Sequence, residues 1–269
     1  MKWSRRLLLL IFLAVGLAVL VWALLQPGNH EPTYEGKKLS HWLTAAIDHR
    51  FSDRQGAIQA TNAVHHIGTN ALPFLLQWME GEIPKWRENL VERLPRKMFW
   101  HPRIARPLLG RAGTRLWLAL TGFEILGEEA APAVPTLIAF AGTQEAETKS
   151  QVALLALSYL GNAGVTALIC IATNNSIPAG QRNAAARCLS LPYVAAGTNL
   201  TWAVPALARC SSDSATTKAA TEALDALAKQ SPSVISNLLE ACSSADPILR
   251  EGATNALRVI APQLIEGLH

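Results

Sequence analysis

Apolar and polar positions alternate in a pattern that repeats along this chain. The pattern covers six residues, with small residues at both ends and apolar residues at the second and fifth positions. Its six copies begin at Ala63, Gly122, Ala156, Ala185, Ala223 and Ala256. A self-similar unit at such spacings predicts a stack of similar helical units. Each copy ends in Gly, Ser or Ala, and small residues of this kind suit a helix C-terminus. We therefore expect each copy to end a first helix.

A second apolar pattern follows five of these copies and predicts a second helix in each unit. It begins at Leu72, Val134, Val165, Val204 and Ile235. Pro73, Pro135 and Pro205 occupy one column of it. Proline is tolerated in the first helical turn, where its missing N–H has no intrahelical acceptor. This column therefore predicts where the second helices begin.

The distances between successive first-helix copies are 59, 34, 29, 38 and 33 residues. Most of them suit a unit of two helices. The longest interval predicts an insertion of roughly 25 residues, because repeat units of this class run to about 33–47 residues. We place this insertion at about residues 82–112. Before the first unit, apolar residues from Leu39 to Ile47 recur at helical spacing and predict a helix that caps the stack.

The N-terminal segment predicts a membrane anchor. Residues 1–6 carry Lys2, Arg5 and Arg6, and residues 7–25 carry no charge. Nineteen helical residues span about 28 Å, close to one hydrocarbon thickness. Preceding positive charge favours a body that faces the periplasm or the cell exterior. The alternative is a signal peptide cleaved near Val21–Ala23, which would leave a secreted protein, although the apolar run is longer than a usual signal sequence. Residues 26–36 read as a linker, and residues 37–269 as the repeat domain.

The alternation of the two patterns resembles HEAT repeats, in particular the HEAT-like subtype named after phycobilisome lyases. The segment from Glu124 to Ile138 carries the best match, and the segment from Tyr34 to Leu43 is similar to the lead-in of some membrane-anchored bacterial HEAT-repeat proteins. The resemblance implies an all-α fold, an α-solenoid that forms a right-handed superhelix of about six HEAT-like helix pairs behind one transmembrane helix. The subtype often carries Asp-x-x-Val-Arg at the start of each first helix. Here only Asp246–Arg250 keeps that shape, so Asp–Arg ladders are not expected in the middle repeats.

Charge is distributed unevenly along the 269 residues, of which 16% are charged and 50% hydrophobic. Residues 82–115 hold nine Lys or Arg and three Asp or Glu, a net charge of +6, whereas residues 116–269 hold eight against twelve, or −4. The basic segment also contains Trp86 and Trp100, and Trp117 follows it closely. Its candidate partner-binding residues are Arg93, Arg96, Lys97, Trp100, Arg103 and Arg106. Such a segment is a solvated loop whose tryptophans pack on the repeats, a surface for anionic membranes or polymers, or, least favoured, a site for nucleic acid.

The second helices are expected to line the concave face of the solenoid. The candidate residues there are Thr136, Thr166, Arg209, Asn237 and Glu240. The leading hypothesis is a membrane-anchored scaffold without enzymatic activity, which binds a protein or peptide through this solenoid. One alternative, implied by the resemblance, is a bilin-lyase-like enzyme or accessory factor. The other is a module that binds anionic surfaces or polyanions through residues 85–115.

The sequence offers no catalytic, cofactor or metal constellation. It lacks a nucleophile elbow, a phosphate-binding glycine loop and a dinucleotide fingerprint. The histidines do not cluster at ligand spacing, so we expect no metal. The four cysteines, Cys170, Cys188, Cys210 and Cys242, form no CxxC pair and are expected to be small buried hydrophobes. If two of them pair, Cys170 with Cys188 is the favoured disulfide.

Overall fold

The computed structural model describes residues 30–50, 53–81, 102–143, 147–191, 201–229 and 231–265. This part of the chain is helical apart from one small hairpin, which confirms the all-α class. The hairpin consists of β1 (Thr33–Tyr34) and β2 (Lys37–Lys38). The helices that follow it are α2 (Leu39–His49), α3 (Arg54–Ile67), α4 (Leu72–Met79) and α7 (Pro102–Leu126). The remaining longer helices are α8 (Val134–Ala141), α9 (Glu147–Tyr159), α10 (Gly161–Thr173), α11 (Ala179–Leu189), α13 (Val204–Cys210), α14 (Thr217–Ala228), α15 (Ser233–Cys242) and α16 (Pro247–Ile260). Short α17 (Pro262–Ile265) follows α16.

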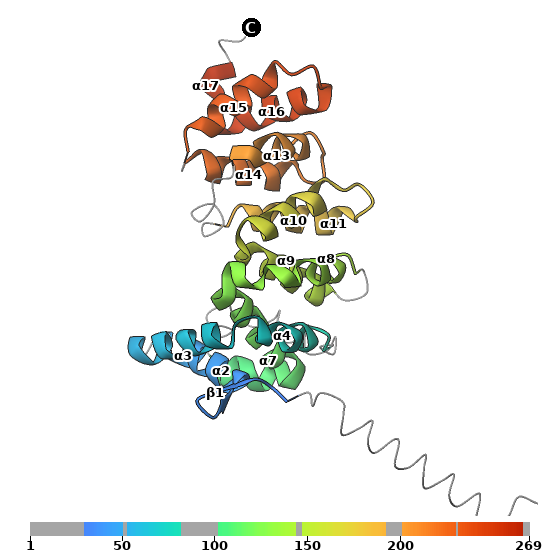
Figure 1. Ribbon diagram of the computed structural model, residues 1–269. Helices are drawn as coiled ribbons and strands as arrows, with labels where there is room; N and C mark the ends of the chain where they lie inside the picture. The colour runs from blue at the N-terminus through green and yellow to red at the C-terminus, as the bar shows by residue number, and fades with distance from the viewer. Residues whose placement is uncertain are drawn as a thin grey trace, which may run out of the picture.

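The helices stack layer upon layer along one axis, from the hairpin and α2 at the base to α16 and α17 at the far end (Figure 1). One row consists of α3, α7, α9, α11, α14 and α16, each of which contacts the next. We call it the first-helix row. The second-helix row consists of α4, α8, α10, α13 and α15; within it α8 contacts α10, α10 contacts α13, and α13 contacts α15. Helix α4 joins this row through contacts with η2 (Gly127–Ala133), the 3-10 turn that leads into α8.

The six-residue patterns end the helices of the first row, as predicted. Helices α3 and α7 stop directly before Gly68 and Gly127, whose φ angles are 56° and 53°. Gly161, which closes the pattern in α9, has φ of 58°. Only glycine adopts this left-handed region without steric cost, because it has no Cβ. The local sequence therefore determines where three of these helices stop.

The proline column also marks helix starts. Pro73, Pro135 and Pro205 are each the second residue of their helix, in α4, α8 and α13. Helix α10 departs from the prediction, because it begins at Gly161 rather than at Val165. A Cβ added to Gly164 would lie 1.9 Å from the carbonyl oxygen of Leu157. Glycine there lets α10 pack directly against the end of α9. The connection between the two helices can therefore be as short as one residue.

A single apolar core runs between the two rows. Its largest fully buried side chains include Phe123 of α7, Leu75 of α4, Leu137 of α8, Leu168 of α10 and Leu207 of α13. Each layer contributes residues to this core and covers the residues of the layer beside it. Burial of apolar surface against neighbouring layers is what stabilises a stack of this kind, since no layer has a closed core of its own.

The folded body begins earlier than residue 37, where we had placed its start. Within the expected linker, Thr33 and Tyr34 pair with Lys38 and Lys37. The backbone N–H of Leu39 donates to the carbonyl oxygen of Pro32 over 2.9 Å. Residues of the expected linker, from Glu31 onward, therefore contact the start of α2 or the hairpin that precedes it.

Two further predictions fall wholly or partly outside the described residues. The expected anchor, residues 7–25, is one of them, and among the described helices none is both long and apolar enough to cross a membrane. Residues 82–101 of the expected insertion are the other. The end of that insertion belongs to α7, which is kinked at Gly110 (φ 66°).

Candidate functional site

The second-helix row offers a surface with almost no charge. Its five helices contain two charged residues, Arg209 in α13 and Glu240 in α15. The exposed positions instead carry small polar or apolar side chains, such as Thr166 and Ala163 of α10, and Ile138 of α8 is the one large exposed hydrophobic residue in the described part of this row. Most of the remaining charged residues of the stack lie in the first-helix row or in the turns. We call the exposed side of α8, α10, α13 and α15 the second-helix surface.

The residues predicted for this surface differ in how accessible they are. Thr166, Arg209 and Glu240 are exposed, whereas Thr136 and Asn237 are half-buried. The hydroxyl of Thr166 donates to the carbonyl oxygen of Asn162 over 2.8 Å, within its own helix. Thr166 and Glu240 are therefore open to a partner.

Arg209 is occupied by an ion pair between layers. Its Nε and Nη2 both lie 3.0 Å from Oδ2 of Asp246. Asp246 caps α16 as well, because its Oδ1 accepts from the backbone N–H of Ile248 over 3.0 Å. The hydrogen bond from Arg209 lowers the pKa of the Asp246 carboxyl most, and the hydrogen bonds from the backbone N–H groups of Leu249 and Ile248 lower it further. Arg209 thus positions α16 against α13 through the residue that caps α16.

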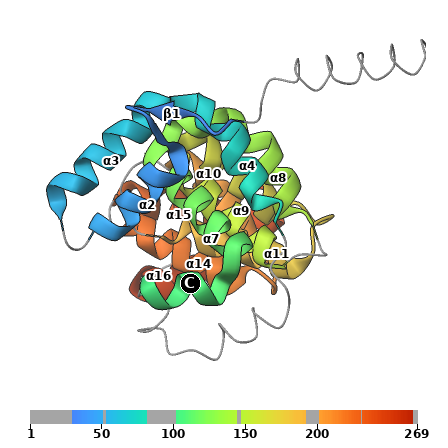
Figure 2. The same cartoon turned by 90° about the horizontal axis from the view of Figure 1, so that it is seen from below.

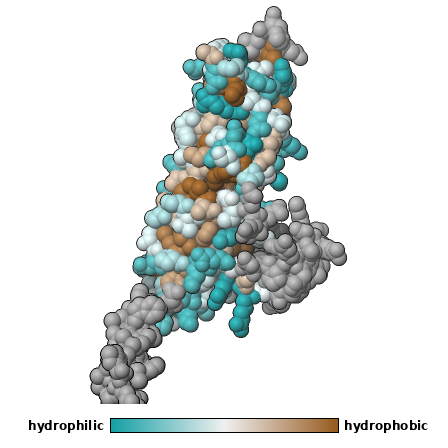
Figure 3. Space-filling view, turned by 90° about the vertical axis from the view of Figure 1, so that its right-hand side faces the viewer, coloured by the Kyte–Doolittle hydropathy of each residue, from teal (hydrophilic) through white to brown (hydrophobic). Residues whose placement is uncertain are grey.

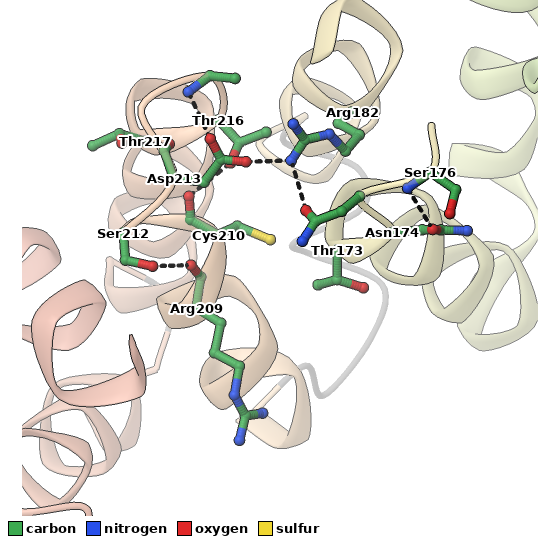
Figure 4. Close-up of polar contacts among 12 residues, drawn as sticks. Thr173, Asn174, Ser176, Arg182, Arg209, Cys210, Ser212, Asp213, Thr216 and Thr217 are labelled. Atoms are coloured by element: carbon green, nitrogen blue, oxygen red, sulfur yellow. Dashed lines mark hydrogen bonds and ion pairs between the residues drawn. The ribbon is translucent and has the colours of Figure 1, made fainter. Parts of the chain in front are cut away.

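A second ion pair joins the layer below, where no Asp–Arg contact was expected (Figure 4). Arg182 of α11 reaches Asp213, in the turn between α13 and α14, with its Nη1. The same Nη1 lies 3.3 Å from Oδ1 of Asn175. The arginine side chain is 12% exposed and the aspartate 32%. The hydrogen bond from the backbone N–H of Ala215 lowers the pKa of the Asp213 carboxyl most, and the hydrogen bond and charge of Arg182 lower it further. Burial of the carboxyl opposes this shift.

A hollow of about 450 Å³ lies beside α11, between α9 and the end of α8. Gln181 borders it, together with Thr143, Ser150 and Gly180. The Gln181 amide Nε2 donates to the carbonyl oxygen of Thr143 over 2.9 Å. Its Oε1 is buried and accepts no hydrogen bond from the described residues. Sequence reasoning missed this hollow, because three separate elements form it.

All four cysteines are free thiols, so the favoured disulfide between Cys170 and Cys188 is absent from the structure. Cys170 is exposed on α10, and its expected burial is therefore wrong. Burial raises the pKa of the Cys188 and Cys210 thiols to about 11. Among the described residues no group of three or more His, Cys, Asp or Glu side chains could hold a metal ion.

The base of the stack carries a group of exposed cations that do not belong to these ion pairs. Lys37, Lys38 and His41 border a shallow hollow of about 520 Å³ beside the hairpin. Arg111 and Arg115 are exposed on α7. Of the six candidate residues predicted in the basic segment, Arg103 and Arg106 lie in α7, and the other four lie outside the described residues: Arg93, Arg96, Lys97 and Trp100.

Comparison with known protein families, with curated proteins and with solved structures found no match to this chain.

Proposed function

We propose that this protein is a membrane-anchored scaffold without enzymatic activity, whose second-helix surface binds a protein or peptide. The proposal takes the helix stack to be an α-solenoid of about six HEAT-like pairs in a right-handed superhelix. Two rows of consecutive helices, six glycine- or small-residue helix ends and a shared proline column support it.

The near absence of charge on the second-helix surface is the observation that carries the proposal. A polyanion would be bound by clustered cations, and this surface has one arginine, which is already paired with Asp246. Small and apolar side chains instead allow a partner to approach closely and to bury apolar area. Apolar patches also recur at successive levels up one side of the stack (Figure 3). A protein or an amphipathic peptide matches these properties better than a charged polymer does.

The anchor is a separate part of the proposal. It rests on the uncharged residues 7–25, which follow three cations. With this segment in a bilayer, the body would face the periplasm or the cell exterior. The stack would then present its second-helix surface to partners along its length.

Co-purification with arginines placed on the second-helix surface tests the binding proposal. Ala139 and Thr166 are exposed on α8 and α10. Ala139→Arg with Thr166→Arg would bury two unpaired charges in the interface and weaken binding by about a hundredfold or more. Gln59→Arg with Asn62→Arg is the matched control, because both residues are exposed on α3 of the first-helix row.

The assay is quantitative mass spectrometry of proteins recovered with the intact chain from solubilised membranes. Partners that are lost with the α8–α10 variant and retained with the α3 variant support the proposal. Equal recovery with both variants would exclude the second-helix surface as the binding site.

A further inference from the structure

The hairpin at the base of the stack holds two lysines in fixed positions. Glu35 and Gly36 form its turn with φ angles of 49° and 74°. Trp42 of α2 is buried beneath it and donates its indole N–H to the carbonyl oxygen of Tyr34 over 3.1 Å. The Lys37 ammonium lies 4.6 Å from the centre of the Trp42 ring. A cation held over an aromatic face is positioned better than a lysine on a free loop.

The hollow beside this hairpin has a basic and polar lining. It is formed by Gly36, Lys37, Lys38, Ser40, His41 and Thr44. No acidic residue lines it, although Glu35 is exposed at the tip of the hairpin. The carboxylate of Glu31 already accepts the backbone N–H of Ser40 at the start of α2. The attraction for an anion therefore comes from the two lysines rather than from the helix terminus.

Helix α7 adds cations to the same end of the molecule. Seen from below, the hairpin, α2 and α7 form the base of the stack (Figure 2). Arg111 and Arg115 of α7 are exposed and four residues apart, so they lie on one side of the helix. Neither forms an ion pair within the described part of the chain. Arg50 of the same base differs, because its Nη2 is paired with Glu124 over 2.8 Å.

The position of this base along the chain specifies its occupant. Five residues, 26–30, separate the proposed anchor from Glu31, which contacts α2. Six Cα–Cα steps span at most about 20 Å, so the base lies close to the surface of any bilayer that holds residues 7–25. A basic face at that distance is attracted to anionic headgroups, at roughly a fivefold shift in the contact equilibrium per lysine or arginine.

We propose that the base of the stack docks on an anionic lipid surface, with lipid phosphates paired to Lys37 and Lys38. Arg111 and Arg115 contribute to the attraction. The inference rests on the proposed anchor, which supplies the tether. Docking would hold the stack upright on the bilayer and leave the second-helix surface open to partners.

Amine labelling of the intact chain in lipid nanodiscs tests this docking. The nanodiscs contain either phosphatidylcholine alone or phosphatidylcholine with phosphatidylglycerol. Labelling of Lys37 and Lys38 is expected to slow at least fivefold on the anionic discs and to recover at high salt. Lys218, exposed on α14, serves as the internal control and should not change.

Charge reversal provides the second measurement. Arg111→Glu with Arg115→Glu should restore fast labelling of Lys37 and Lys38 on anionic discs. Arg187→Glu with Arg258→Glu makes the same change in net charge at exposed positions of α11 and α16, far from the base, and should leave the protection intact. Circular dichroism melts of both variants check that the stack remains folded.

The outcomes separate the docking from the anchor. An anchored chain whose Lys37 and Lys38 label equally fast on both kinds of disc overturns the docking alone. A chain that alkaline carbonate releases from membranes overturns the anchor. It overturns the docking as well, because no membrane-spanning segment then holds the base near the bilayer.

Discussion

Removal of the Arg182 side chain is expected to loosen the junction between α11 and the turn that precedes α14. Arg182→Ala deletes the contacts of Nη1 with Asp213 and Asn175. Loss of one partner of a fully buried ion pair costs about 3–5 kcal/mol. An exposed pair is worth at most about 1 kcal/mol. With Arg182 12% exposed and Asp213 32% exposed, we expect a loss of about 2 kcal/mol.

A double-mutant cycle separates the pair from its surroundings. Asp213→Ala also removes the hydrogen bond from the backbone N–H of Ala215, so the single variants alone overstate the interaction. The cycle with Arg182→Ala should give a coupling of about 1–1.5 kcal/mol. The matched control is the Lys229–Asp225 pair, whose lysine is 72% exposed and whose coupling should not exceed about 0.5 kcal/mol.

Hydrogen exchange of the α11 and α14 amides is the appropriate assay, because helices that are held by contacts with their neighbours can open locally. The pKa of Asp213 is lowered in the folded state, so its contribution is present at neutral pH and is lost as the pH falls through that lowered value. At pH values under about 4, the protection of these amides should therefore decrease in the wild type and should change less in Asp213→Ala. A coupling no larger than that of Lys229–Asp225 would refute the reasoning.

Two other properties of the stack give further predictions. Gly164→Ala should destabilise the protein by about 3 kcal/mol or more, because the new Cβ would lie 1.9 Å from the Leu157 carbonyl oxygen. Gly180→Ala is the control: its Cβ meets no atom within 4 Å, and it should stabilise by about 0.4–1 kcal/mol in thermal denaturation. A maleimide should modify Cys170 in the folded chain and leave Cys210 unmodified, because Cys210 is 5% exposed and its pKa is raised to about 11. Rapid modification of Cys210, measured by mass spectrometry, would contradict the buried thiol.

The sequence predicted those parts of the fold that depend on local backbone conformation. These parts include the left-handed residues at Gly68 and Gly127 and the prolines in the first helical turns. Each of them determines the backbone of only a few neighbouring residues, so the local sequence is enough to predict its effect. The exposure of Cys170 could have been found too. Ala163, Thr166 and Cys170 are spaced as one helical face, and all three are exposed.

Features that depend on distant residues were missed. Asp213 is 31 residues from Arg182, in a turn that lacks the Asp-x-x-Val-Arg shape. The partner of Gln181 is the carbonyl oxygen of Thr143, 38 residues away. Neither contact leaves a local pattern in the sequence, because each joins a residue of α11 to a residue that lies between two other helices, across loops of varying length.

Photo-crosslinking in native membranes tests the central claim most directly. A crosslinking amino acid is placed at Thr166, on the second-helix surface, or at Gln59, on the first-helix row, and both positions are exposed. The account predicts a discrete protein adduct at position 166 that Ala139→Arg abolishes, and no such adduct at position 59. Adducts of the same mass and yield at both positions, or none at position 166, would contradict it.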